Sequence, residues 1–82
     1  MNRLILREIT EELGANPLQK LGLTERQTEV LHWITKGKRD EEIGLILRIS
    51  TRTVNNHVQA VLRQLRVETR TAAALAAFEC LK

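Results

Sequence analysis

Residues 50–65 have the sequence STRTVNNHVQAVLRQL, in which apolar and polar residues recur at the spacing of an α-helix. The apolar residues fall on one side of that helix: Val54, Val58, Val61, Leu62 and Leu65. The polar residues fall on the opposite side: Arg52, Asn55, Asn56, Gln59 and Arg63. We therefore expect a helix from about Thr51 to Leu65, capped by the Ser50 hydroxyl, that buries one side and exposes the other.

A shorter helix is predicted immediately before this one. Asp40 can cap a helix over residues 41–47, and Glu41 and Glu42 then fall in its first turn, where the helix dipole stabilises negative charge. The apolar residues of this helix are Ile43, Ile46 and Leu47. Only three residues separate the two helices, and a short helix, a tight turn and a longer helix form a helix-turn-helix.

Further upstream, residues 24–27 read Thr-Glu-Arg-Gln, which is a capping-box pattern for a helix start. The helix that begins there carries Val30, Leu31 and Ile34 on one side and is expected to end at Gly37. Trp33 is expected to be a core or half-buried residue rather than a ligand platform.

Downstream, a last helix is predicted over residues 70–81 with Thr69 as its cap. It is rich in alanine and apolar on more than one side, so it is either deeply buried or offered to a partner. A symmetric dimer would stabilise so small a domain, and small residues let two helices approach closely. The predicted dimer interface comprises Ala72, Ala73, Leu75 and Ala76. Cys80, the only cysteine, is interpreted as a reduced core or interface thiol.

The N-terminal residues are predicted to form a separate element. Residues 3–13 have helical spacing of apolar residues, and the stretch around Pro17 stops the helix. This divides the chain into residues 1–22, a short helix and linker, and residues 23–82, the helix-turn-helix domain. With no alternating pattern that would indicate strands, the predicted fold class is all-α, with four helices in the domain.

Charge is concentrated in one part of the chain. The 82 residues carry a net charge of +3, but residues 48–70 hold five arginines against the single acid Glu68. Such a basic stripe is typical of nucleic-acid binding, although a solvated helix face is the alternative. Asn and Gln can pair with the edge of adenine, and Arg with guanine or phosphate, whereas a merely solvated face more often carries compensating Glu and Lys. The chemistry of the exposed face therefore favours double-stranded DNA as the partner.

Several function classes are excluded by what the sequence lacks. It contains no catalytic arrangement of Ser, His and Asp, no metal-ligand spacing and no Gly-rich phosphate loop, so we expect no enzyme activity, no cofactor and no metal. His32 and His57 each stand alone, and His57 is expected at the edge of the core. No signal peptide or membrane-spanning run is present, which predicts a soluble cytoplasmic protein.

The pattern resembles the LuxR/GerE-type helix-turn-helix that forms the C-terminal domain of many bacterial response regulators and quorum-sensing receptors. The resemblance covers about residues 23–77 without a gap. Its residues here are Leu23, Thr24, Arg26, Glu29, Val30, Leu31, Gly37, Glu42, Ile43, Leu47, Ile49, Ser50, Thr53, Val54, His57, Leu65, Val67, Arg70 and Ala73.

The resemblance implies a four-helix domain whose third helix enters the major groove and whose fourth helix forms a dimer on DNA. Carried over by position, the predicted DNA-binding residues are Thr51, Arg52, Thr53, Asn55, Asn56, Gln59 and Arg63. The chain departs from the family where Asn55 and Gln64 replace usual lysines, Ala60 replaces a usual asparagine and Arg66 a usual glycine. Fewer lysines imply fewer phosphate contacts.

Two functional hypotheses follow. The first is a sequence-specific, double-stranded DNA-binding transcriptional regulator that acts as a dimer. The second, motivated by the reduced number of basic residues, is a protein-interaction module that keeps the fold but docks its last or first helix on another regulator. Family members usually attach this domain to a receiver or a small-molecule sensor, so the chain is either free-standing or the end of a longer protein.

Overall fold

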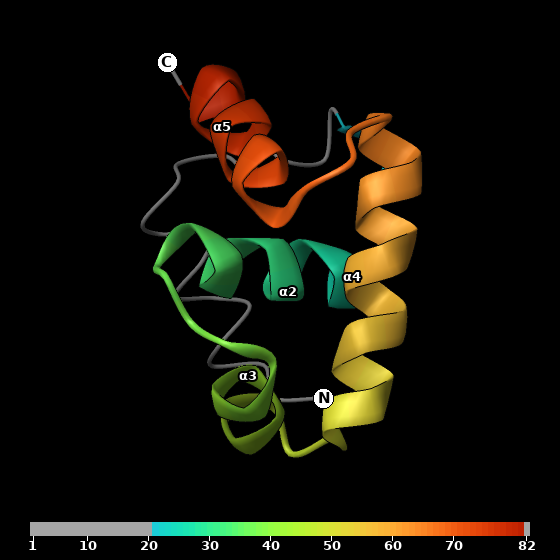
Figure 1. Cartoon of the computed structure of the whole chain (residues 1–82), viewed down its shortest axis with the longest axis vertical. Coiled ribbons are helices and arrows are strands. Elements are labelled where there is room, and N and C mark those ends of the chain that lie inside the picture. Colours follow the sequence, from blue (N-terminus) through green and yellow to red (C-terminus); the bar gives the residue numbers. More distant parts are fainter. Residues whose placement is uncertain (1–20, 82) are drawn as a thin grey trace.

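Four helices make up the part of the chain that the computed structural model describes, residues 21–81 (Figure 1). They are α2 (Glu25–Thr35), α3 (Asp40–Leu47), α4 (Thr51–Leu65) and α5 (Arg70–Leu81). This confirms the all-α fold class and the expected helix order. The predicted helix over residues 3–13 and residues 14–20 of the predicted linker lie outside the described residues.

The start of α2 is the capping box that the sequence predicts. The Thr24 amide donates to Oε1 of Gln27 over 3.1 Å, and the Gln27 amide donates to the Thr24 hydroxyl over 3.2 Å. At the other end, Gly37 adopts a left-handed conformation (φ 77°) and the Lys38 amide donates to the Trp33 carbonyl. The helix is therefore closed at both ends by local hydrogen bonds.

The start of α3 differs from the prediction by one residue. Asp40 is the first residue of the helix and not its cap; the cap position belongs to Arg39, whose amide donates to Oε1 of Glu42 over 2.9 Å. This hydrogen bond lowers the pKa of Glu42. The prediction was wrong because the Asp40 carboxylate is bound by Arg70, which lies 30 residues further along the chain.

The turn between α3 and α4 is held by backbone hydrogen bonds. Arg48 adopts the left-handed conformation (φ 59°, ψ 45°), and the amides of Arg48 and Ile49 both donate to the Gly44 carbonyl. The chain then extends through Ser50, whose hydroxyl accepts the Thr53 amide over 3.0 Å, as the sequence predicts. This turn fixes the direction in which α4 leaves α3.

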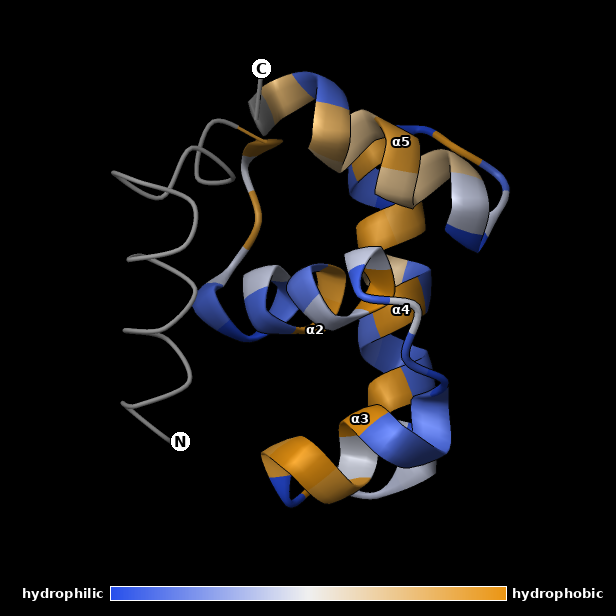
Figure 2. Ribbon diagram, turned by 90° about the vertical axis from the view of Figure 1, so that its left-hand side faces the viewer, coloured by the Kyte–Doolittle hydropathy of each residue, from blue (hydrophilic) through white to orange (hydrophobic). Residues whose placement is uncertain are grey.

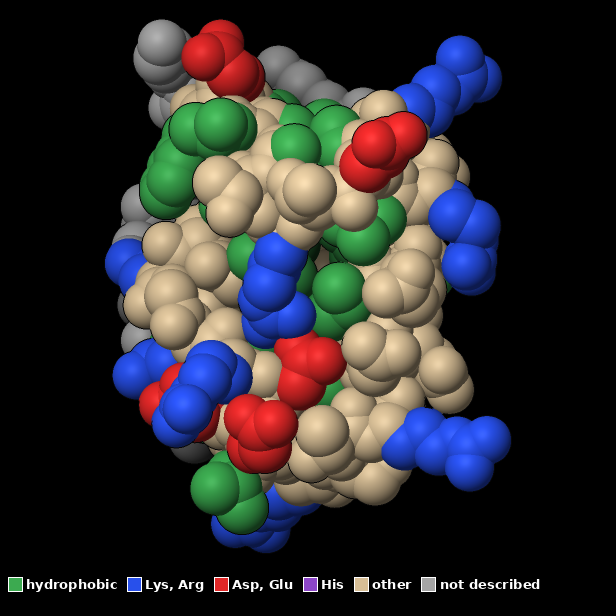
Figure 3. All heavy atoms as spheres, viewed as in Figure 1, with side chains coloured by type: hydrophobic (Ala, Val, Ile, Leu, Met, Phe, Trp, Pro, Cys, Tyr) green, Lys and Arg blue, Asp and Glu red, His purple; other side chains and the backbone are tan. Residues whose placement is uncertain are grey.

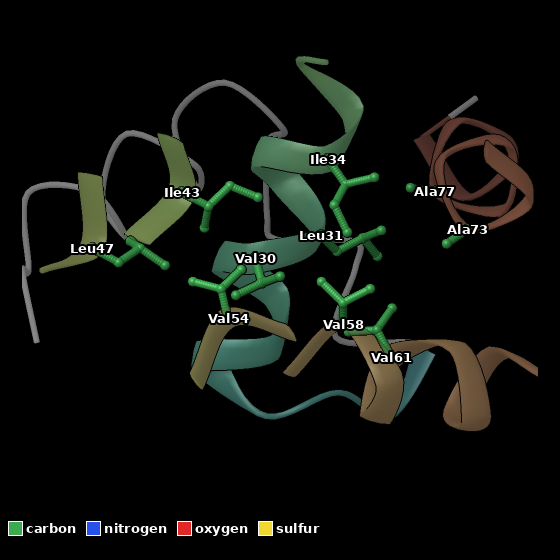
Figure 4. Packing of buried hydrophobic residues seen from close by; sticks show 10 residues of the cluster. All are labelled: Val30, Leu31, Ile34, Ile43, Leu47, Val54, Val58, Val61, Ala73 and Ala77. Carbon is green, nitrogen blue, oxygen red and sulfur yellow. The ribbon is translucent and has the colours of Figure 1, made fainter. Parts of the chain in front are cut away.

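One hydrophobic core joins the four helices (Figure 4). Helix α4 packs against α2, α3 and α5, and α2 also packs against α5. The buried apolar residues are Val30, Leu31, Ile34, Ile43, Leu47, Val54, Val58, Val61, Ala73 and Ala77. Leu62 and Leu65 are partly buried at the margin of this core. Figure 2 shows both apolar and polar segments along α4, which lies behind α2 and α5 in that view.

Helix α5 begins as expected. The Thr69 hydroxyl accepts the Ala72 amide over 3.0 Å, and Ala73 and Ala77 lie against α2 and α4 with no exposed surface. Trp33 is half-buried, as predicted, and its ring meets that of His32 in an edge-to-face arrangement, with the ring centroids 4.8 Å apart. Cys80 is partly buried against the core.

Candidate nucleic-acid interface

The outer side of α4 is a continuous polar surface, which we call the α4 polar face. Among the seven predicted DNA-binding residues, Thr53 is half-buried and the others are exposed: Thr51, Arg52, Asn55, Asn56, Gln59 and Arg63. Figure 3 shows Lys and Arg side chains projecting from the edge of the molecule formed by α4. The structure therefore places all seven residues on one helix, and six of them are exposed.

The first turn of α4 is ordered by a pair of hydroxyl groups. Ser50 donates its hydroxyl proton to Oγ1 of Thr53 over 2.9 Å while accepting the Thr53 amide. Because the Thr53 hydroxyl accepts in this pair, its own proton is available to a further acceptor. Thr53 is thus a positioned donor at the N-terminal end of the α4 polar face.

The electrostatics of α4 are basic from one end to the other. Arg52 and Arg63 are exposed on the helix, Arg48 and Arg66 are exposed in the residues that flank it, and α4 itself contains no Asp or Glu. A phosphate backbone approaching this side meets positive charge and amide groups without an opposing carboxylate on the helix. The exception is a carboxylate of α3, because Oδ2 of Asp40 lies 3.5 Å from Nδ2 of Asn55 in the second turn of α4.

Asp40, Arg70 and Asn55 form a network that the sequence does not predict. Nη1 of Arg70 lies 2.5 Å from Oδ1 of Asp40, and Nη2 of Arg70 donates to the Lys38 carbonyl over 2.9 Å. The second carboxylate oxygen, Oδ2, lies 3.5 Å from Nδ2 of Asn55. These side chains come from three helices, so only the tertiary structure brings them together.

Gln64 has a structural role at the far end of α4. It stands where the family usually has lysine, and its Nε2 donates to the Leu21 carbonyl over 3.2 Å. This contact joins residues 43 positions apart and fixes the chain before α2 against α4. A basic side chain is thereby replaced by an internal hydrogen bond.

Helix α2 contains a buried carboxylate. The Glu29 side chain has no exposed surface, and Nη1 of Arg26 lies 3.8 Å from its Oε1. No hydrogen-bond partner is present for either Glu29 oxygen among residues 21–81. Burial, which favours the neutral acid, outweighs the attraction of Arg26 and raises the pKa of Glu29.

His57 lies at the edge of the core, as predicted. It is half-buried, and burial together with the nearby positive charge of Arg26 lowers the pKa of His57 from its usual 6.5. Neutral imidazole is thus favoured at neutral pH. Across residues 21–81, no group of three or more His, Cys, Asp or Glu side chains is placed to hold a metal ion.

Helix α5 carries a second exposed surface, but it differs from the predicted one. Leu75 and Phe78 are 59% and 47% exposed, whereas Ala73 has no exposed surface because it packs in the core. Ala72 and Ala76 are half-buried beside them. Ala73 therefore cannot belong to a contact surface of the folded domain, and Phe78, which the prediction omitted, lies on it.

The comparison with known families identifies the domain. Residues 21–77 match the family model described as bacterial regulatory proteins, luxR family. The chain belongs to the luxR family. This luxR-family domain is a DNA-binding helix-turn-helix, and its match covers α2, α3, α4 and most of α5.

Relatives of the luxR-family domain are transcriptional regulators. The chain is 48% identical to the transcriptional activator protein SolR of Ralstonia nicotianae over 74% of its length. It is 42% identical to the transcriptional regulatory protein LiaR of Bacillus subtilis over 76% of its length, and 42% identical to the nitrate/nitrite response regulator protein NarP of Escherichia coli over 65%. These matches span 26%, 29% and 25% of the relatives, respectively. No solved structure matches the chain significantly.

The luxR family and these relatives are regulators rather than enzymes, which agrees with the sequence-based prediction. None of the helices described between residues 21 and 81 is long and apolar enough to cross a membrane. The comparisons thus place the luxR-family domain among regulatory proteins.

Proposed function

We propose that this protein is a sequence-specific regulator of transcription that inserts α4 into the major groove of double-stranded DNA. The observation that carries the proposal is the α4 polar face, which is exposed, basic and rich in amides on the side opposite the buried valines. An α-helix fits the width of the major groove, and the second helix of a helix-turn-helix is the one that reads base edges.

In this arrangement the amide side chains read bases. Asn55, Asn56 and Gln59 are exposed at positions one and three residues apart, so they point in the same general direction from α4. Asn56 and Gln59 each carry a donor and an acceptor and can pair with adenine through both, and Asn55 carries the same amide group. These three residues supply the sequence preference.

The hydroxyl and guanidinium groups contact the DNA backbone. Thr51 and Arg52 lie at the exposed start of α4, Thr53 has a hydroxyl proton to donate, and Arg63 lies two turns beyond Asn56. Such contacts fix the register of the helix on the duplex and carry no sequence information. Because Gln64 is held by the Leu21 carbonyl, it adds no charge to this set.

The proposal is tested by fluorescence anisotropy with labelled duplexes at several salt concentrations. Binding should weaken linearly with salt on logarithmic axes, with a slope that counts the phosphate contacts. Asn56→Ala and Gln59→Ala should each relax base preference by about 1 to 3 kcal/mol, whereas Arg52→Ala should weaken binding to every sequence alike. Equal affinity of the unmutated protein for all duplexes would contradict the assignment of base-reading residues.

We further propose that two copies bind together through α5. The exposed pair Leu75 and Phe78, flanked by Ala72 and Ala76, offers an apolar surface on the side of α5 away from the core. A symmetric dimer places two α4 helices on two half-sites of one operator. The proposed dimer interface therefore comprises Ala72, Leu75, Ala76 and Phe78. Ala73 is left out because it is buried in the core.

The second candidate function is a protein-interaction module. It is favoured by the same exposed residues of α5, because an apolar surface of this kind also fits a helix of another regulator. Failure to bind any duplex at low salt, together with capture of a defined regulator through α5, would support this function over DNA binding.

The proposal for the regulatory input of the domain is based on one of the named relatives. NarP is named as a response regulator, and the match covers only 25% of its length. We propose that the luxR-family domain of this chain takes its regulatory signal from a sensor or receiver domain or from a partner protein.

A further inference from the structure

The carboxylate of Asp40 is held in a fixed position between three helices. Asp40 is the first residue of α3, and its side chain is only 17% exposed. The guanidinium of Arg70, at the start of α5, donates through Nη1 to Asp40 and through Nη2 to the Lys38 carbonyl. Because the guanidinium is planar and uses two of its nitrogens, it fixes both the place and the orientation of the carboxylate.

The free oxygen of this carboxylate faces a residue of the α4 polar face. Oδ2 of Asp40 lies 3.5 Å from Nδ2 of Asn55, a long hydrogen bond at the exposed edge of the network. An ionised carboxylate only accepts hydrogen bonds, so it attracts the amino side of the amide and repels the carbonyl side. The carbonyl oxygen of Asn55 is therefore turned away from Asp40.

We propose that Asp40 is a positioning residue that decides which group of Asn55 is presented to DNA. This inference rests on the proposed insertion of α4 into the major groove. There, adenine and cytosine expose an amino group, whereas guanine and thymine expose a carbonyl oxygen. With its amino group engaged by Asp40, Asn55 presents an acceptor and selects a base that carries an amino group.

The test begins with the duplex that the unmutated protein selects from a randomised pool. Its affinity is then measured by anisotropy for all four base pairs at each position. Asn55→Ala identifies the base pair that Asn55 reads, because discrimination there should fall on the order of tenfold while other positions keep theirs.

Asp40→Asn then tests the positioning role. This variant keeps an acceptor for Arg70 but directs an amino group at Asn55, so the Asn55 amide should reverse. Discrimination at the base pair read by Asn55 should shift from bases with an amino group toward bases with a carbonyl oxygen. Asp40→Ala should reduce the discrimination at this base pair. Adding Asp40→Ala to Asn55→Ala should cause no further loss of discrimination.

Glu41→Gln is the matched control, because it removes the same charge from an exposed neighbour on α3. It should raise affinity for all sequences alike and leave discrimination unchanged. Circular dichroism verifies the fold of each variant. If Asp40→Ala fails to fold, the result with Asp40→Asn alone tests the positioning role.

Two outcomes would overturn the inference, and they are distinguishable. If Asp40→Asn changes affinity uniformly, as Glu41→Gln does, Asp40 acts through its charge alone while the proposed function stands. If the unmutated protein binds no duplex at low salt, the proposed function itself is overturned, and the role of Asp40 with it.

Discussion

At the scale of single residues, two arginines occupy a conformation that favours glycine. Arg48 ends α3 and Arg66 ends α4, both with φ close to 60°, whereas Gly37 has the corresponding place after α2. All three segments close with an amide that donates to a carbonyl five residues earlier. The backbone geometry is thus shared, but two of the three positions carry a Cβ that disfavours it.

Replacing Arg66 with glycine should stabilise the domain. The left-handed conformation costs a residue with a Cβ about 1 to 2 kcal/mol, and part of this gain is offset by the greater freedom of glycine in the unfolded chain. We expect Arg66→Gly to raise the free energy of unfolding by up to about 1 kcal/mol in urea titrations. Arg66→Ala keeps the Cβ and should show no such gain; equal stabilisation by both variants would contradict the strain argument.

Glu29 should make stability depend on pH. Its pKa is raised above 4.5 in the folded state by burial, so folding favours the protonated acid. The contribution is fully present below about pH 4.5 and is lost as the pH rises through the folded-state pKa. Urea titrations between about pH 4 and pH 8 should show Glu29→Gln gaining stability relative to the unmutated protein as the pH rises. A difference that is constant with pH would mean that the pKa of Glu29 is the same in the folded and unfolded states.

At the scale of elements, the helix-turn-helix depends on local hydrogen bonds that the sequence predicts well. The Thr24 capping box, the Ser50 cap and the Thr69 cap each involve residues within one helical turn. Their partners are set by spacing alone, so the starts of α2, α4 and α5 were predicted correctly. The start of α3 was predicted wrongly, because the Asp40 carboxylate binds the guanidinium of Arg70 on α5 instead of a nearby backbone amide.

Removal of the Ser50 cap should weaken α4 specifically. Ser50 accepts the Thr53 amide and donates to the Thr53 hydroxyl, so Ser50→Ala leaves the amide without its partner. We expect a loss of about 1 kcal/mol in the free energy of unfolding measured by urea titration. Ser50→Asp supplies another acceptor at the same place and should retain most of the stability; a loss equal to that of Ser50→Ala would argue against a capping role.

At the scale of the whole molecule, one face of α5 completes the core and the opposite face remains exposed. Ala73 and Ala77 fill the contact with α2 and α4, while Leu75 and Phe78 stay outside. The alanine-rich sequence predicted a helix that is apolar on more than one side. The sequence could not show which side of α5 is buried and which is exposed, because that depends on the position of α5 relative to the core.

A charge on the outer side of α5 should separate dimer formation from DNA contact. Leu75→Glu should lower affinity for a duplex with two half-sites at least tenfold, while affinity for a single half-site stays close to that of the unmutated protein. Sedimentation and anisotropy measure the two effects. Leu45→Glu, at another exposed leucine on α3, is the control and should leave the ratio of the two affinities unchanged. An unchanged ratio with Leu75→Glu would exclude α5 as the dimer surface.

The sequence by itself determined the helices, most of their ends and the separation of α4 into a buried and a polar face, because these depend on neighbours within a few residues. The tertiary structure decided three matters: the burial of Ala73 and Glu29, the contact of Gln64 with Leu21, and the network of Asp40, Arg70 and Asn55. Each depends on groups from different parts of the chain. These groups come into contact only when the helices pack together, and the spacing of residues along the chain does not specify those contacts.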